Sequence, residues 1–462
     1  MTQYGVWFGW RTTCLFGCIV SLCLSCGGGD TSSGPRRAPE STPTQTQRSE
    51  PEPAPVSRAT VLAGVDGPRR TMEDLPFDHS WDLSLPAPVH MTWMDDAQPG
   101  LLFVQIKTGQ IHGIDAYSGM TRWVTKALPV LLRKDQPPFV ARDRIRTDGG
   151  GEELDDRLYV ISGDRLMVFD CAYGQLIWSF HIGQGGQWGF QPSSGPTVAG
   201  SARNARVFIG DWEGRVRVIS FDERRGRAFV RWQWNLLDVP TAQPVPHDNA
   251  VYVADRGGKM RAFAFDREMR WEYDAQAPIL HPCYVRGRSL YFGDDDNVFH
   301  VLDRRTGRRL GAQYLPSSVN GRPFAFSAEP ERLYVWTGDG AEPAGLRGFR
   351  TISDNVTYTD VERHHLEVER IDQEWFLPGI ARVVASSPGQ IYATRRNSLV
   401  VLGIGRATGE INWHWDLRDL ELPGDPIIDL VSYTDASDEI RTVITTSARG
   451  RLVAYRLFGH TR

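Results

Sequence analysis

The chain has 462 residues, with 56 acidic and 52 basic side chains and a formal net charge of −4. This balance argues against a nucleic-acid-binding protein, which would carry a basic face. Hydrophobic residues make up 41% of the chain and include 15 tryptophans, enough for a large core. The length exceeds that of a usual single domain, which favours either several domains or a fold that grows by repetition.

Residues 1–25 are predicted to be a signal peptide of the lipoprotein type. The apolar run from Thr12 to Leu24 has signal-peptide length and is too short to span a bilayer comfortably. It ends in Leu-Ser-Cys26, which resembles a bacterial lipobox, although Cys23 stands where a leucine is usual. This resemblance implies lipidation of Cys26. An ordinary secretory signal or an uncleaved anchor remains the alternative.

Residues 26–75 are predicted to form a disordered tether. Ser, Thr, Pro, Glu and Gln dominate this segment and aromatic residues are almost absent, so it cannot bury enough apolar surface to order itself. By the sorting rule of lipoproteins, Gly27 after the lipidated cysteine implies delivery to the outer membrane. Only Cys171 and Cys283 lie beyond the tether, in different repeat units, and a disulfide between them is not expected.

Residues 76–462 contain an internal repeat. Asp115, Gly119 and Trp123 are spaced by four residues and again by four. Asp170 begins a second unit with the same spacing, and later units keep parts of it: Trp232 comes two residues late, and the turn after Asp266 is shorter. A repeat of this length indicates a solenoid or a propeller.

Each repeat reads as four short strands. Runs of β-branched and aromatic residues, such as 158–161 and 251–254, lie between clusters of Gly, Asp and Asn, which is typical of strands in hairpins. Four-stranded units arranged around an axis form a β-propeller. Eight third strands are expected, and they end near Asp115, Asp170, Asp222, Asp266, Asp303, Asp372, Gly405 and Leu457.

The last repeat lacks a fourth strand, and a spare tryptophan-bearing strand at Ser80–Leu85 precedes the first repeat. Pairing of these two segments would close the ring and leave no open sheet edge. The predicted fold is therefore all-β: an eight-bladed β-propeller whose ring is closed by an N-terminal strand.

The recurrent glycine turn, strand, aspartate, glycine and tryptophan resemble the quinoprotein-type (PQQ-like) repeat. The Gly-His and Trp-Asp pairs of WD repeats do not recur. Quinoprotein dehydrogenases of this family carry adjacent cysteines and a calcium site, whereas this chain has no adjacent cysteines and no assignable catalytic aspartate. We therefore expect no enzyme activity, no cofactor and no metal, and we keep a PQQ-dependent dehydrogenase as the least favoured reading.

Two insertions interrupt the repeats, at 143–156 in the first hairpin of blade 2 and at 338–365 in the middle hairpin of blade 6. Such hairpins open on opposite faces of the disc, so the insertions are expected on opposite faces. Metal ligation by His364 or His365 with Asp354 and Asp360, and calcium at Asp294–Asn297, are weaker readings. Hairpin turns favour Asp and Asn for local hydrogen bonding alone.

A lipobox, a tether and eight PQQ-like blades without catalytic residues together resemble the BamB family of outer-membrane assembly lipoproteins. Segment 235–244, which enters blade 4, resembles the family loop that faces the barrel-inserting subunit, although the family's arginine is missing. The resemblance implies apolar contacts from Leu236, Leu237 and Val239, with Arg231 and Asp238 at the rim and Thr241 in the matching motif. An ordinary blade-to-blade connection is the alternative.

The predicted function is therefore a non-catalytic envelope scaffold for protein–protein interaction, with a role in the assembly of outer-membrane β-barrels. The scaffold would be anchored by lipid, face the periplasm and act as a monomer within a complex, and no nucleic-acid partner is expected. The alternative is a periplasmic or surface propeller that binds another protein or a polysaccharide.

Overall fold

The fold is known from a computed structural model, which describes residues 77–95, 100–134, 136–141, 144–146, 152–182, 192–200, 204–325, 331–338, 342–357, 365–387, 389–395, 400–417, 425, 427–434 and 440–457. The chain divides into residues 1–55 and 56–462, and the first of these units lies outside the described residues. The predicted signal peptide, tether and Cys26 therefore also lie outside them.

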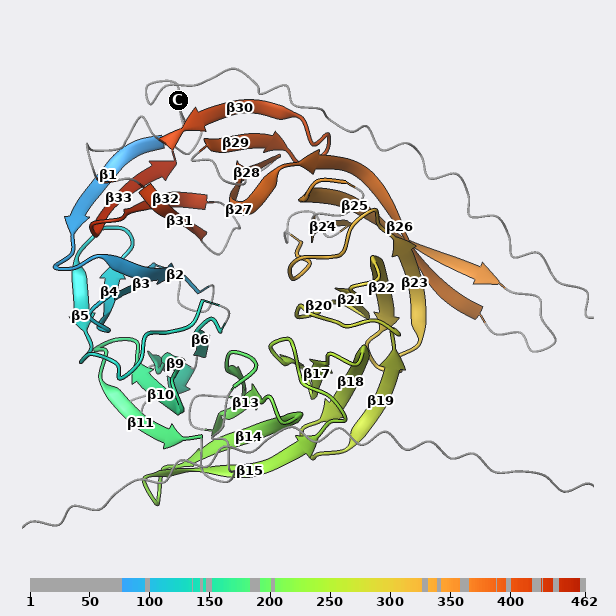
Figure 1. Cartoon of the computed structure of the whole chain (residues 1–462), viewed down its shortest axis with the longest axis horizontal. Coiled ribbons are helices and arrows are strands. Elements are labelled where there is room, and N and C mark those ends of the chain that lie inside the picture. Colours follow the sequence, from blue (N-terminus) through green and yellow to red (C-terminus); the bar gives the residue numbers. More distant parts are fainter. Residues whose placement is uncertain are drawn as a thin grey trace, which may run out of the picture. The chain divides into compact units, whose positions relative to one another are not determined.

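The second unit is a ring of eight antiparallel sheets, as the repeat predicts (Figure 1). Blade 1 consists of β2 (Val89–Trp93), β3 (Leu101–Ile106), β4 (Ile111–Asp115) and β5 (Thr121–Val124). Blade 2 consists of β6 (Phe139–Ala141), β9 (Arg157–Ser162), β10 (Arg165–Asp170) and β11 (Leu176–His181). Blade 3 consists of β12 (Thr197–Ala199), β13 (Arg206–Gly210), β14 (Arg215–Asp222) and β15 (Arg227–Asn235). Blade 4 consists of β16 (Val245–His247), β17 (Ala250–Ala254), β18 (Lys259–Ala264) and β19 (Met269–Asp274).

The remaining blades complete the ring. Blade 5 consists of β20 (Tyr284–Arg286), β21 (Ser289–Gly293), β22 (Val298–Asp303) and β23 (Arg309–Tyr314). Blade 6 consists of β24 (Arg332–Thr337), β25 (Gly345–Thr357) and β26 (His365–Pro378). Blade 7 consists of β27 (Ile380–Ser387), β28 (Gln390–Arg395), β29 (Val400–Gly405) and β30 (Ile411–Asp416). Blade 8 consists of β31 (Ile427–Thr434), β32 (Ile440–Ser447), β33 (Arg451–Leu457) and β1 (Phe77–Ser84).

The N-terminal strand closes the ring as predicted. β1 pairs antiparallel with β33 and supplies the outer strand of blade 8, so the blue and red ends of the ring lie side by side in Figure 1. Arg451 of β33 donates hydrogen bonds of 2.8 and 2.5 Å to Asp82 of β1 across this pair. The core lies between neighbouring blades; Leu102 of blade 1, for example, shares a cluster with Trp81 and Ile444 of blade 8.

All eight outer strands carry a β-bulge at the same register. In seven of them the residue after the bulge is a tryptophan, and in blade 5 it is Gly311. The seven tryptophans are Trp81, Trp123, Trp178, Trp232, Trp271, Trp375 and Trp413. A bulge strengthens the local twist and redirects side chains. Its repetition therefore turns the indole ring of each outer-strand tryptophan toward the next blade.

The prediction for blade 6 was wrong. Asp372 does not end the third strand, because it lies inside the outer strand β26, where it pairs with Arg350 of β25. The insertion lengthens the hairpin of the third and fourth strands, and β25 and β26 extend beyond the ring (Figure 1). Within the described residues this sheet has three strands, and isolated pairs such as Phe324 with Tyr334 mark the innermost position.

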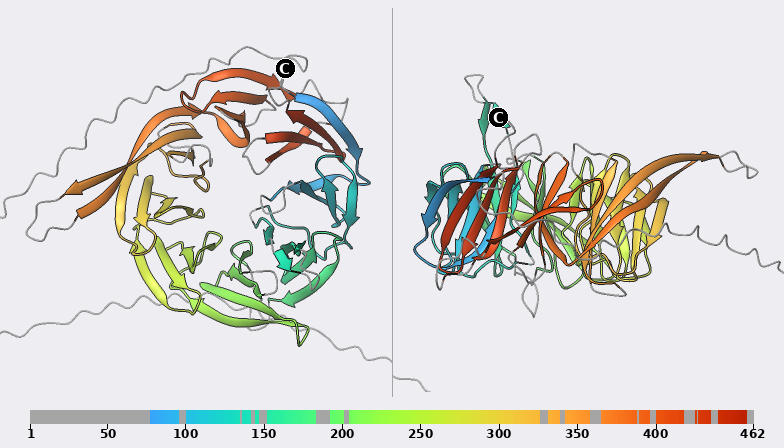
Figure 2. Two further views of the ribbon diagram at one scale, coloured as in Figure 1. Left: turned by 180° about the vertical axis from the view of Figure 1, so that it is seen from behind. Right: turned by 90° about the horizontal axis from the view of Figure 1, so that it is seen from above.

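This reassignment also corrects the predicted faces of the two insertions. β7 (Arg144–Arg146) and β8 (Glu152–Leu154) form a hairpin within the first connection of blade 2, and they stand above the disc in Figure 2. First and third hairpins of a blade open on the same face because strands alternate in direction. The β7–β8 and β25–β26 hairpins therefore lie on one face, here called the first-hairpin face, and the second hairpins open on the opposite face.

Candidate functional site: the connection between blades 3 and 4

The segment from Leu236 to Thr241 joins the outer strand of blade 3 to the inner strand of blade 4 and lies on the second-hairpin face. The Leu236 amide donates to the carbonyl of Gly214 in the β13–β14 turn (2.7 Å). The carbonyl of Val239 accepts from the amide of Arg256 in the β17–β18 turn (2.9 Å). The Thr241 hydroxyl donates to the carbonyl of Ile279. These bonds fix the segment to three neighbouring loops.

The side chains of this segment have different roles. Leu237 is 96% exposed, whereas Leu236 is half-buried and packs against the aromatic core around β13–β15. The half-buried carboxylate of Asp238 accepts a hydrogen bond from the Val239 amide (2.7 Å), and Val239 itself is half-buried. Of the three apolar residues predicted to make contacts, only Leu237 presents its whole side chain to solvent.

Arg231 does not lie beside this segment. It is the bulged residue in the middle of β15, five residues before Leu236, which corresponds to about 16 Å along a strand. Its guanidinium lies 5.3 Å from the centre of the Trp232 ring, in a pocket next to the β18–β19 turn on the first-hairpin face. The structure therefore separates Arg231 from Asp238, which were predicted to share one rim.

Two exposed apolar residues beside Leu237 were not predicted. Trp212, 51% exposed, lies in the β13–β14 turn that holds the Leu236 amide. Leu280, 42% exposed, follows Ile279 in the connection that holds Thr241. Trp212, Leu237 and Leu280 are thus exposed apolar residues on hydrogen-bonded loops of one face, here together called the Leu237 surface. A tryptophan within a Gly-Asp-Trp-Glu-Gly turn, where polar residues are usual, was the available sequence signal.

The residues considered for metal binding give no site in the described part of the chain. No group of three or more His, Cys, Asp or Glu side chains is arranged there to hold a metal ion. Asp294 is buried and its carboxylate accepts from the amides of Asp296 (3.1 Å) and Val298 (2.8 Å) and contacts His300 (2.7 Å). This is the local turn bonding that was the alternative to calcium. His364 and Asp360 lie outside the described residues, as do the side chains of Asp354 and His365.

Cys171 lies in the β10–β11 turn and Cys283 just before β20, and both are buried free thiols. Burial raises the pKa of Cys171 well above its usual value and that of Cys283 to about 12, so both stay protonated and unreactive at neutral pH. Within the described ranges, no helix has the length and apolar character needed to cross a membrane.

The ring of eight bulged, mostly four-stranded sheets defines the chain as an eight-bladed β-propeller. Residues 214–357 match the family model described as "Outer membrane protein assembly factor BamB", a span that contains the whole Leu236–Thr241 segment. This match, over residues 214–357 only, supports a PQQ-like β-propeller family. No curated protein sequence matches it significantly.

Solved structures are similar to this chain at low sequence identity. Sqt1 of Saccharomyces cerevisiae is 10% identical, with a TM-score of 0.51 over 86% of this chain and all of that one. BamB from Moraxella catarrhalis is 14% identical, with a TM-score of 0.36 over 84% of this chain and 99% of that one. The quinohemoprotein alcohol dehydrogenase of Comamonas testosteroni is 14% identical, with a TM-score of 0.47 over 84% of this chain and 77% of that one.

Proposed function

We propose that this protein is a non-catalytic scaffold that acts in the assembly of outer-membrane β-barrel proteins and binds its partner through the Leu237 surface. The observation that carries the proposal is the almost complete exposure of Leu237 on a hydrogen-bonded loop. The match of residues 214–357 to the BamB family model, which includes this loop, supports the role in assembly.

The geometry of the surface suits protein recognition. Apolar and aromatic anchors at the centre of an interface carry most of its binding energy, and tryptophan is enriched among them. Because three loops share hydrogen bonds, Trp212, Leu237 and Leu280 are held before the partner arrives, and little ordering entropy is lost on binding. The proposed partner is the barrel-inserting subunit of the assembly machine.

The proposed location is the periplasmic side of the outer membrane, with the propeller anchored through a lipid on Cys26. Such an anchor raises the local concentration of the propeller near a membrane partner without adding a contact. Replacing Cys26 by Ser is expected to move the protein from the membrane fraction to the soluble periplasmic fraction. Unchanged membrane association would argue against this anchor.

The decisive experiment is crosslinked purification of the protein from its native envelope, with mass spectrometry of the captured proteins. Leu237→Asp places a charge at the centre of the surface and is expected to reduce recovery of the barrel-inserting subunit about tenfold or more, as expected for loss of a central anchor. Met120→Asp is the matched control, because Met120 is 69% exposed in the β4–β5 turn of another blade and on the other face.

Equal recovery with Leu237→Asp and Met120→Asp would exclude the Leu237 surface. Recovery of a different envelope protein would favour a binding propeller with another partner. The proposal that the protein is not an enzyme has its own test: the purified chain, supplied with the quinone and calcium, is expected to show no dye-linked alcohol oxidation.

A further inference from the structure

Neighbouring blades are joined by a repeated contact of the outer-strand tryptophan. The Trp123 indole N–H donates to the carbonyl of Cys171 in the next blade (2.7 Å). A Cβ placed on Gly174 of the same turn would lie 2.4 Å from the Trp123 ring, so the turn packs directly on the indole. The same contact with a turn carbonyl and a glycine is made by Trp81, Trp271 and Trp375.

The joint between blades 3 and 4 lacks this contact. The β18–β19 turn of blade 4 is short and has Arg267, at φ +89°, and no glycine. The carbonyl of Arg267 in this turn accepts instead from the indole N–H of Trp234 (3.1 Å). Trp232, the register equivalent of Trp123, is 9% exposed, and its N–H has no partner among the described residues.

Three arginine side chains occupy the space around Trp232 instead. The guanidinium carbons of Arg206, Arg231 and Arg267 lie 5.7, 5.3 and 5.4 Å from its ring centre. Arg206 also lies over Phe265, at 5.1 Å. None of these three arginines forms an ion pair with a described residue. Burial, and then the charge of Arg231, lower the pKa of Arg206, so these like charges are held close without a counter-ion.

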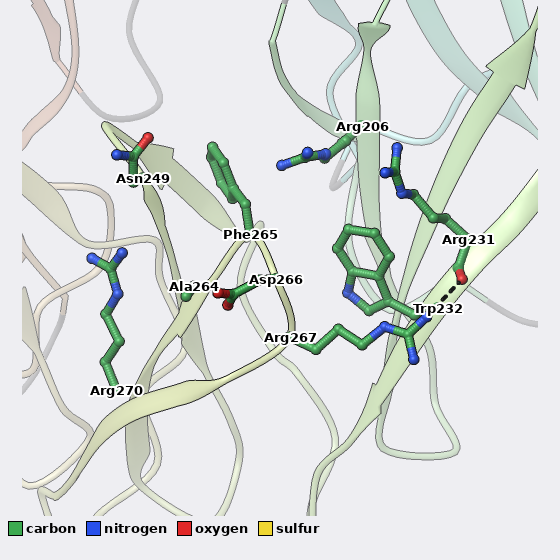
Figure 3. A pocket seen from close by; sticks show the side chains of 9 residues that line it. All are labelled: Arg206, Arg231, Trp232, Asn249, Ala264, Phe265, Asp266, Arg267 and Arg270. Atoms are coloured by element: carbon green, nitrogen blue, oxygen red, sulfur yellow. Dashed lines mark hydrogen bonds between the residues drawn. The ribbon is translucent and has the colours of Figure 1, made fainter.

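Where the contact of tryptophan with a turn carbonyl and a glycine is lacking, the structure has a pocket of about 590 Å³ (Figure 3). Its wall carries four arginines, including Arg270, against the single carboxylate of Asp266. Figure 3 shows the indole nitrogen of Trp232 on the side of the ring that faces Asp266 and Arg267. The pocket therefore offers N–H donors from several directions and a net positive charge. It lies on the first-hairpin face, opposite the Leu237 surface.

We propose that this pocket is a binding site for a phosphoryl group. Guanidinium groups present fixed N–H forks that match phosphate oxygens, and stacking over an aromatic ring leaves the N–H edges free for an anion. A tetrahedral oxyanion presents its oxygens in several directions and can accept from Arg206, Arg231, Arg267 and the Trp232 indole at once, whereas a carboxylate presents its two oxygens in one plane. The pocket is larger than inorganic phosphate, so the natural ligand carries the phosphoryl group on a larger body, either a lipid head group or a soluble phosphate ester.

The test uses the full chain with Cys26→Ser, so that no acyl chain carries it to a membrane. Isothermal titration with inorganic phosphate probes a soluble ligand. Co-sedimentation with phosphatidylcholine vesicles, with and without phosphatidylglycerol, probes a lipid head group. Arg231→Gln is expected to weaken binding about ten- to hundredfold, as for loss of a charged hydrogen bond. Trp232→Phe keeps a ring in place but removes the donor, and is expected to weaken binding about tenfold.

Arg227→Gln is the matched control, because Arg227 is an exposed arginine on the same strand that does not line the pocket. Phosphate binding that is lost in Arg231→Gln and kept in Arg227→Gln would support a soluble phosphate ester. The same pattern with phosphatidylglycerol vesicles alone would support a lipid head group. Equal binding by the two variants, or no binding of either probe by the parent chain, would overturn the proposal. These outcomes do not depend on recovery of the barrel-inserting subunit.

Discussion

A buried pair between an aspartate that follows the second strand and a basic side chain on the third strand recurs in three blades. In blades 3, 4 and 5 an aspartate after the second strand faces a basic side chain six residues later. The pairs are Asp211 with Arg217, Asp255 with Arg261 and Asp294 with His300. In blade 1, Ile106 occupies the aspartate position, and His112 is buried with no partner for either ring nitrogen among the described residues. A buried unsatisfied imidazole is destabilising.

His112→Leu is therefore expected to raise the free energy of unfolding by about 1–3 kcal/mol at neutral pH, because the unpaired polar group is removed. Burial lowers the pKa of His112 below its ordinary value of 6.5. As the pH falls, the unfolded chain therefore takes up the proton at a higher pH than the folded chain does. The free energy of unfolding is unaffected by this titration above pH 6.5 and decreases as the pH drops below 6.5. The gain in melting temperature should widen between pH 7.5 and 5.5, as measured by differential scanning calorimetry.

His300→Leu is the matched control for this prediction. It leaves the buried carboxylate of Asp294 without its basic partner and is expected to destabilise the protein by about 3–5 kcal/mol. If His112→Leu also destabilised the protein, or if its advantage did not change with pH, His112 would have a partner in solution.

At the scale of the elements, the joint between blades is the recurring unit, and the sequence predicts it only in part. The Asp–Gly–Trp spacing predicts where each turn and outer tryptophan lie. The late position of Trp232 and the short turn after Asp266 were visible in the sequence as irregularities. In the structure both irregularities lie in the joint between blades 3 and 4, where a pocket forms. This outcome depends on the pairing of β14 with β15 and on contacts between blades, which the spacing in the sequence does not specify.

The sequence did not predict the extended hairpin of blade 6, for a related reason. Gly311 replaces the outer tryptophan of blade 5 because the backbone of β26 passes over it; a Cβ there would lie 2.3 Å from the carbonyl oxygen of Glu369. The Glu369 carboxylate accepts hydrogen bonds from Ser289 and Tyr291 of blade 5. The sequence shows a missing tryptophan and a following insertion, but the contact that links them is between residues about 60 positions apart.

The tryptophan joints should differ in their contribution to stability. Trp123→Phe removes the N–H that donates to Cys171 (2.7 Å) and leaves that buried carbonyl with one acceptor bond fewer. A loss of about 1–3 kcal/mol in the free energy of unfolding is expected, measured by urea denaturation. Trp232→Phe breaks no hydrogen bond to a described residue and should cost clearly less. Equal losses in the two variants would show that ring volume, and not the hydrogen bond, sets the strength of a joint.

At the scale of the whole molecule, closure of the ring was predictable because each of the two segments that pair to close it has its own local signal in the sequence. The last repeat stops after its third strand, and a tryptophan-bearing strand without a repeat precedes the first. The relative faces of the insertions were not predictable, because they depend on which hairpin of blade 6 is lengthened. The alternation of hairpin faces in blades 3 and 4 places the Leu237 surface and the arginine pocket on opposite faces, so that the two proposed ligands would not compete for the same surface.

Ring closure gives the last prediction. A chain that begins at residue 85 lacks β1 and therefore loses the pairing with β33, the Arg451–Asp82 ion pair and the Trp81 indole bond to Ala116 (2.9 Å). The reference is a chain that begins at residue 76 and keeps β1. Loss of a buried tryptophan alone costs about 3–5 kcal/mol, and the freed edge of β33 offers unpaired backbone groups to other chains. The shorter chain should therefore melt at a lower temperature and associate, as measured by scanning calorimetry and by size-exclusion chromatography with light scattering. A monomer with the melting temperature of the reference would mean that the other blades hold the ring without this closure.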